Sequence, residues 1–157
     1  MGILNYTTKI PVEKTISEIE KMLAQAGAKK ILKEYDSDTN IQSISFMIET
    51  NKGLIPIKLP MNGGAVLQVL KNQSGEYKGN SYNRKRVVPQ SQVNKEQAAR
   101  VGWRIIKDWL EAQLALFFLQ MVKIEEIFLP YMFDSNTGKT MFETLEKKGF
   151  LLEHKED

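Results

Sequence analysis

Hydrophobic and polar residues first follow a helical period near the start of the chain. Four apolar residues recur there at spacings of three and four, namely Ile16, Ile19, Leu23 and Ala26. One apolar stripe at this spacing predicts a helix over Val12–Ala26, and Gly27 stands where a left-handed residue commonly ends a helix. The start of the helix has two readings: a capping box of Thr15 and Glu18, or an earlier beginning just after Pro11.

The period then changes to two, which is typical of strands. Alternation is clearest over Gln42–Glu49, where the residues of one face alternate with those of the other: Ile44, Phe46 and Ile48 against Ser43, Ser45 and Met47. Strands are also predicted over Lys30–Tyr35 and Leu54–Leu59, and turn-forming Asp, Asn and Gly residues separate the three. Pro56 lacks an N–H for the ladder, which indicates an edge strand. The pattern predicts an antiparallel meander with one polar face.

A short helix and a long polar segment follow. The side chain of Asn62 is placed to cap a helix that runs through Leu70. Residues 73–92 show no clear periodicity. Loops of this length are uncommon inside a compact domain and are often functional.

The last third of the chain is predicted to be helical. Asn94 and Gln97 fit a capping box for a long helix that reaches about Val122, a length of roughly 40 Å. Two shorter helical segments are expected over Ile124–Phe133 and Thr140–Lys148. We therefore expect one α+β domain over residues 1–157, in three parts: a helix and meander in 1–70, a basic loop in 71–93 and a helical part in 94–157.

Composition narrows the function mainly through what the chain lacks. It has 157 residues, of which 42% are hydrophobic and 26% charged, as in a folded globular protein. There is no cysteine, and the one histidine is His154, three residues from the end. Catalysis would have to use carboxylates or tyrosines, so we expect a binding protein without cofactor or metal rather than an enzyme. Neither a signal-like segment nor a long apolar run is apparent, which predicts a cytoplasmic protein.

Charge is distributed unevenly along the chain. Residues 71–107 hold 9 basic and 2 acidic side chains, a net charge of +7. Residues 1–70 hold 8 basic and 7 acidic ones, and residues 108–157 hold 5 basic and 10 acidic ones. An asymmetry of this size indicates a surface that meets a charged partner.

The centre of the basic segment interleaves aromatic and cationic side chains: Tyr77, Lys78, Tyr82, Arg84, Lys85 and Arg86. Single-stranded DNA or RNA is bound by this combination, because cations follow the phosphates while aromatic rings stack on the bases. An acidic protein or an anionic nucleotide would suit the same charges. The plainer alternative is a solvated loop whose charges only keep the protein soluble.

Arg100, Arg104 and Lys107 share one face of the predicted long helix and could extend this basic surface. Each also has a carboxylate four residues away, which gives three possible pairs: Glu96–Arg100, Arg104–Asp108 and Lys107–Glu111. Such pairs contribute only about 0.2–0.5 kcal/mol each. We favour a stripe neutralised within the helix, and keep Arg100 and Arg104 as candidate anion-binding residues.

The segment Leu114–Leu119 is apolar on all sides of the same helix. A helix of this kind is normally buried all round. Either the core of the chain or a second subunit could cover it, so a homo-oligomer through this segment is one of two readings.

Two pairs of segments carry a resemblance to a known family: Asn5–Pro11 with Glu13–Ile19, and Gln97–Gln113 with Phe128–Met132. They resemble small, mostly uncharacterised proteins encoded by phages and prophages, chiefly of Gram-positive hosts. The likeness covers most of the chain but departs in residues 73–92, and it carries over no catalytic residue. It implies a protein of the host cell cytoplasm. There it would be an accessory of replication or recombination that binds single-stranded nucleic acid. Alternatively, it would be a counter-defence protein that occludes a host immune effector or sequesters an anionic nucleotide signal.

Overall fold

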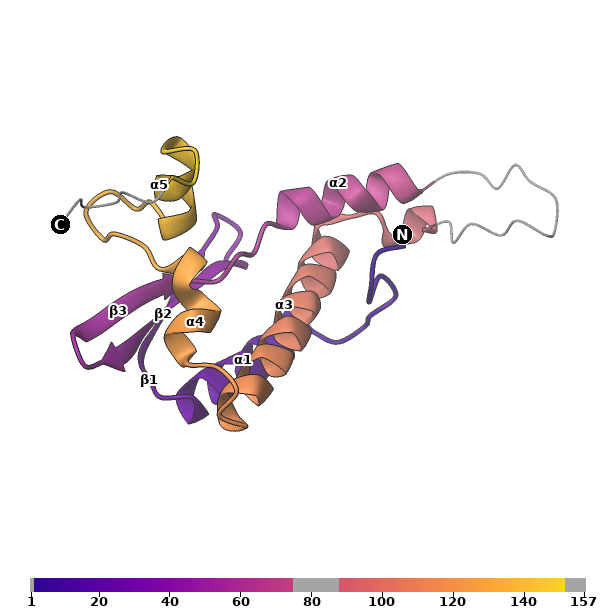
Figure 1. The fold of residues 1–157 in the computed structure, drawn as a ribbon. Helices are drawn as coiled ribbons and strands as arrows, with labels where there is room; N and C mark the ends of the chain where they lie inside the picture. The colour runs from indigo at the N-terminus through magenta and orange to yellow at the C-terminus, as the bar shows by residue number, and fades with distance from the viewer. Residues whose placement is uncertain (1, 75–87, 152–157) are drawn as a thin grey trace. The chain divides into compact units, whose positions relative to one another are not determined.

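The computed structural model of the chain describes residues 2–74 and 88–151. The fold is α+β, with an N-terminal helix, a three-stranded antiparallel sheet and a mostly helical C-terminal half (Figure 1). The predicted fold class is confirmed. The chain forms two compact units, each built from two separate stretches: residues 1–22 with 61–112 in unit 1, and residues 23–60 with 113–157 in unit 2.

The first helix, α1 (Val12–Gln25), begins directly after Pro11. The earlier of the two expected starts is therefore right, and the capping box of Thr15 is wrong. Thr15 is buried inside the helix, and its hydroxyl accepts and donates no hydrogen bond. Gly27 follows with a φ of 99°, as expected for a residue that ends a helix.

Unit 1 contains the helix α2 (Gly63–Gln73), the short 3-10 turn η1 (Gln90–Gln92) and most of the long helix α3 (Lys95–Phe118). The side chain of Asn62 caps α2 by accepting a hydrogen bond of 3.0 Å from the backbone N–H of Ala65. The predicted start of α2 is confirmed, and the helix runs three residues past its predicted end at Leu70.

A glycine allows α3 and the segment before α2 to approach closely. A methyl group added at Gly102 would lie 2.6 Å from the terminal carbon of Met61 and 3.3 Å from a methyl group of Val66. Trp103, the next residue along α3, is fully buried. The backbone of α3 therefore forms part of the packed surface of unit 1.

The sheet of unit 2 has the order β1-β2-β3 and pairs β1 (Ala28–Tyr35), β2 (Ile41–Thr50) and β3 (Gly53–Lys58) antiparallel. The strands with Pro56 and Lys30 are thus the edges, as expected for Pro56. One face is buried, and its innermost residues are those that the alternation predicts together with one from β3: Ile44, Phe46, Ile48 and Ile57.

The opposite face carries polar residues but is not open throughout. Ser43 and Ser45 are only 5% and 9% exposed. Their neighbours across the sheet are longer: Glu34 lies beside Ser43, and Leu32 and Lys58 lie on either side of Ser45. Long side chains on the two edge strands screen the short serines between them from water. Ser43 also donates a hydrogen bond to Glu34.

The predicted helix over Ile124–Phe133 is wrong in its second half. The helix α4 (Ile124–Phe128) passes into a 3-10 turn, η2 (Leu129–Tyr131), that contains a proline. Met132 then pairs with Ile57, and the N–H of Phe133 donates to the carbonyl of Pro56 over 3.1 Å. A ladder position beside β3 thus replaces the last helical turn. The ring of Phe128 packs edge-on against Phe46, with centroids 5.1 Å apart.

The long helix also ends before its predicted limit at Val122. Gln120 adopts a φ of 60°, and the N–H of Met121 donates to the carbonyl of Leu116 over 3.0 Å. This is the hydrogen bond of a Schellman C-cap, which closes α3 after 24 residues, or about 36 Å. Within the apolar segment Leu114 is buried, whereas Phe118 is 55% exposed, so that segment is not wholly covered.

The last helix, α5 (Met141–Lys147), follows its prediction closely. Thr140 caps its start in a capping box with Glu143, and Gly149 has the positive φ expected of its end. Among the described residues, no helix is both long and apolar enough to cross a membrane.

Candidate nucleic-acid interface

The aromatic and basic residues proposed to bind nucleic acid lie outside the described residues: Tyr77, Lys78, Tyr82, Arg84, Lys85 and Arg86. The structure does describe the two points between which they lie. Ser74 and Val88 form an isolated bridge, and the N–H of Val88 donates to the carbonyl of Gln73 over 2.9 Å. The two residues that flank these thirteen positions in the sequence are therefore neighbours in unit 1.

Apolar packing holds Val88, the residue that follows the segment. Val88 is 2% exposed and forms a buried cluster with Leu70 of α2 and Ala98 of α3. Val93 packs on the same cluster from the link between η1 and α3. Moving Val88 would therefore expose core side chains. The bridge of Ser74 and Val88 is thus held in place by the core of unit 1.

The N-terminal residues pack on the same buried cluster. Ile3 and Tyr6 pack against the cluster of Leu70, Val88 and Ala98. The N–H of Ile3 also donates to the side-chain oxygen of Gln73 over 3.1 Å. Gln73 thus joins three segments, because its own carbonyl accepts from Val88.

Gln97 fixes the N-terminal residues to α3. The expected cap of α3 is present, since the side chain of Asn94 accepts from the N–H of Gln97 over 2.8 Å. The reciprocal half of the capping box is wrong. The amide nitrogen of Gln97 donates instead to the carbonyls of Tyr6 and Thr8, over 2.8 and 3.0 Å. Its oxygen accepts from the guanidinium of Arg100 over 2.8 Å.

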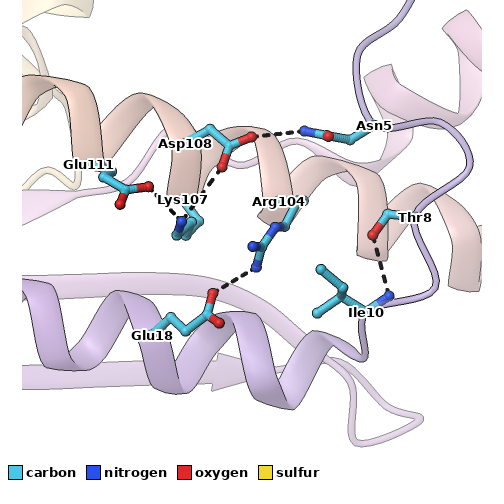
Figure 2. Close-up of polar contacts among 8 residues, drawn as sticks. All are labelled: Asn5, Thr8, Ile10, Glu18, Arg104, Lys107, Asp108 and Glu111. Atoms are coloured by element: carbon cyan, nitrogen blue, oxygen red, sulfur yellow. Dashed lines mark hydrogen bonds and ion pairs between the residues drawn. The ribbon is translucent and has the colours of Figure 1, made fainter.

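Arg104 also has a partner far away in sequence. Its guanidinium donates to Glu18 of α1 over 2.6 Å (Figure 2), and the two side chains are 18% and 35% exposed. The expected partner within the helix, Asp108, accepts instead from the side-chain amide of Asn5 over 3.0 Å and lies 3.8 Å from Lys107. The ion pair therefore links α3 to α1 within unit 1.

The third predicted pair of the helix is present. The ammonium group of Lys107 lies 2.5 Å from the carboxylate of Glu111, one turn further along α3 (Figure 2). Only 15% of the Lys107 side chain is exposed. With Arg100 on an amide and Arg104 on a carboxylate, every cation of this helix face has a partner inside unit 1.

Two other lysines of the basic segment are better placed to meet a partner. Lys71 lies in the last turn of α2, and Lys95 begins α3. Both are exposed, and no ion pair among the described residues involves either. Both contribute to the charge of residues 71–107, but neither belongs to the motif of aromatic and cationic residues. Their positions close to the two ends of the segment are the signal that would have identified them.

No group of three His, Asp or Glu side chains in the described part of the chain could hold a metal ion. No protein-family model, no curated protein and no solved structure matches this chain. The function is therefore argued from the chemistry of its own residues.

Proposed function

We propose that this protein binds single-stranded nucleic acid through the segment between Ser74 and Val88. In the phage context that the resemblance implies, it would serve replication or recombination as an accessory. The observation that carries the proposal is the composition of that segment. Its thirteen residues include four cations, one carboxylate and two tyrosines.

This combination suits an unpaired strand for a physical reason. Phosphates attract the cations and release their own counterions, which gives affinity without sequence preference. Unstacked bases expose faces on which tyrosine rings can stack, each worth about 1–3 kcal/mol. A double helix hides those faces, so a stacking contribution favours single strands.

The described neighbourhood of the segment supports the same reading. Holding both ends at the bridge of Ser74 and Val88 means that the entropy of closing the loop is lost on folding, not on binding. Lys71 and Lys95 add exposed charge near the two ends. Arg100 and Arg104 are already engaged inside unit 1, so we expect them to contribute less than the cations of the segment.

The test is the fluorescence anisotropy of a labelled oligothymidine titrated with protein at several salt concentrations. Replacing Arg84, Lys85 and Arg86 together by alanine should weaken binding at low salt by more than about tenfold. It should also reduce the slope of log affinity against log salt by about 2, since each lost phosphate contact removes about 0.7. A matched control removes three exposed lysines elsewhere, Lys14, Lys21 and Lys52, and should change both quantities little.

A second variant separates stacking from charge. Tyr77→Ala with Tyr82→Ala should weaken binding at every salt concentration while leaving the salt slope unchanged, because no phosphate contact is lost. If the control variant of Lys14, Lys21 and Lys52 loses as much affinity as the variant of residues 84–86, only the net charge of the protein matters. No binding to the oligonucleotide at low salt would overturn the proposal.

A further inference from the structure

Exposed apolar side chains gather in two places on unit 2. The first place, here called the α3-end patch, consists of Phe118, Leu119 and Met121, which are 55%, 70% and 67% exposed. The second, the α5 patch, consists of three residues in and just after the last helix: Phe142, Phe150 and Leu151, which are 48%, 57% and 74% exposed. Clustered apolar exposure of this kind marks surfaces that meet another molecule.

The α5 patch lies on a helix that has little support of its own. None of the seven residues of α5 is buried. Isolated helices shorter than about 12 residues are marginal in water. Three contacts hold this one: its capping box, a hydrogen bond of 2.7 Å from the N–H of Met141 to the carbonyl of Met132, and a tilted contact between the rings of Phe142 and Phe150. A partner on its apolar side would add the packing that most helices have.

The two patches are bordered by charges of opposite sign. Next to the α5 patch, the Lys139 ammonium lies so close to Lys147 that it lowers the pKa of Lys147. Two cations crowded together on an exposed surface are stabilised by a nearby carboxylate. Glu125 and Glu126 stand in the first turn of α4, only a few residues after the α3-end patch. Glu143 and Glu146 also stand on α5, and Lys123 caps α4, so the opposite signs are those of the net charges. Lys139, Lys147 and Lys148 with Glu143 and Glu146 give +1, whereas Glu125 and Glu126 with Lys123 give −1.

The two patches of one copy do not meet. Within unit 2, α4 separates α5 from the end of α3 (Figure 1). We propose that they meet between two copies of the chain: the α5 patch of each copy packs on the α3-end patch of the other, with Lys139 and Lys147 facing Glu125 and Glu126.

The area is sufficient for a stable pair. Three large, half-exposed apolar side chains make a patch of roughly 300–400 Å², which is near the size of the largest patch on a typical monomer. A two-fold arrangement buries both patches of each copy, so each copy contributes about 600–800 Å². This approaches the roughly 800 Å² per partner of a standard interface. One patch alone would fall well short.

Analytical ultracentrifugation of the full chain, without nucleic acid, tests the proposal. We expect a dimer at micromolar concentrations. Leu119→Asp and Phe142→Asp should each shift it to monomer, because each breaks both contacts of the two-fold pair. Both side chains are exposed, so folding should persist, as circular dichroism would verify. The matched control is Leu4→Asp, an exposed leucine of unit 1, which should remain dimeric.

Mixing the two monomeric variants gives the decisive result. One of the two contacts in a mixed pair joins unaltered patches, so the mixture should form heterodimers with an affinity between those of wild type and variants. No association in the mixture would mean that each patch meets its own copy, which contradicts the proposal. A monomeric wild type would overturn it outright.

Charge reversal tests the polar border separately. Lys147→Glu should weaken the dimer by about tenfold, and adding Glu125→Lys to the same chain should restore it, because the pair is then reversed in both contacts. If the second change weakens the dimer further, these charges do not face each other.

Discussion

Gln120 occupies a backbone conformation that favours glycine, and this one residue decides where the longest helix stops. Its φ is 60°, and its N–H donates to the carbonyl of Phe117 over 2.9 Å. For an L-residue with a side chain, the left-handed region costs about 1–2 kcal/mol. The structure accepts this cost because the turn satisfies carbonyls at the end of α3 that would otherwise lack partners.

Replacing Gln120 by glycine should therefore stabilise the protein. We expect a gain of about 1 kcal/mol in the free energy of unfolding, measured by urea denaturation, since glycine reaches the left-handed region without strain. Gln113→Gly is the matched control. It places the same substitution inside α3 and should destabilise by about 1 kcal/mol. Equal effects of the two changes would rule out strain at Gln120.

Asn94 and Gln97 show what a local sequence pattern can and cannot predict. The cap by Asn94 was predictable, because its hydrogen bond to Gln97 spans three residues. The side chain of Gln97, in contrast, bonds to carbonyls 91 and 89 residues away. No spacing rule relates such distant positions, so the capping box was a reasonable expectation but only its local half was right.

Helices and strands were predicted best where one period of hydrophobic residues runs over the whole element. The alternation of β2 and the apolar stripe of α1 gave both elements to within a residue or two. Errors came at ends that another element decides. Residues 132 and 133 lie at the edge of the sheet because the carbonyl of Pro56 in β3 accepts from the N–H of Phe133, a partner that the sequence around Pro130 does not reveal.

The same competition between near and distant partners governs the helix face of α3. Asp108 is one turn from Arg104, yet Arg104 pairs with Glu18 of α1. Asp108 is more than half exposed and already contacts Asn5 and Lys107. Because Arg104 lies against α1, its ion pair with Glu18 is better shielded from water than a surface pair within one helix.

A double-mutant cycle on Glu18→Ala and Arg104→Ala tests this link between elements. We expect a coupling of about 1 kcal/mol in the free energy of unfolding, at the upper end for partly exposed pairs. The matching cycle on Lys107 and Glu111 should give about 0.3–0.5 kcal/mol, as for pairs within one helix. A coupling near zero for Glu18 and Arg104 would show that the ion pair contributes no stability.

At the scale of the whole molecule, the two units differ in charge as well as in exposed apolar surface. Unit 1 holds 12 basic and 7 acidic side chains, whereas unit 2 holds 10 basic and 12 acidic ones. Both apolar patches belong to unit 2. The two proposals thus assign polyanion binding and self-association to different units. The sequence showed the charge imbalance, but it could not show that residues 61–112 fold with the first 22.

If both proposals hold, a dimer should bind long strands more tightly than short ones. Wild type and Leu119→Asp should have equal affinity for an oligonucleotide that one copy covers. On a strand long enough for two copies, wild type should bind at least about tenfold more tightly, because the second contact becomes intramolecular. Anisotropy with both oligonucleotides measures this. A variant that loses affinity for the short one would show that Leu119 also affects the binding segment.

The bridge between Ser74 and Val88 has an evolutionary consequence. It brings Ser74 beside Val88, which must fit the core with Leu70 and Ala98, and thereby closes the chain over the thirteen positions between them. Doubling the length of a closed loop costs only about 0.6 kcal/mol. Mutation can therefore lengthen, shorten or recompose the intervening residues while the scaffold persists. A gene under pressure to change the target of its protein could vary this one stretch and inherit the rest unchanged.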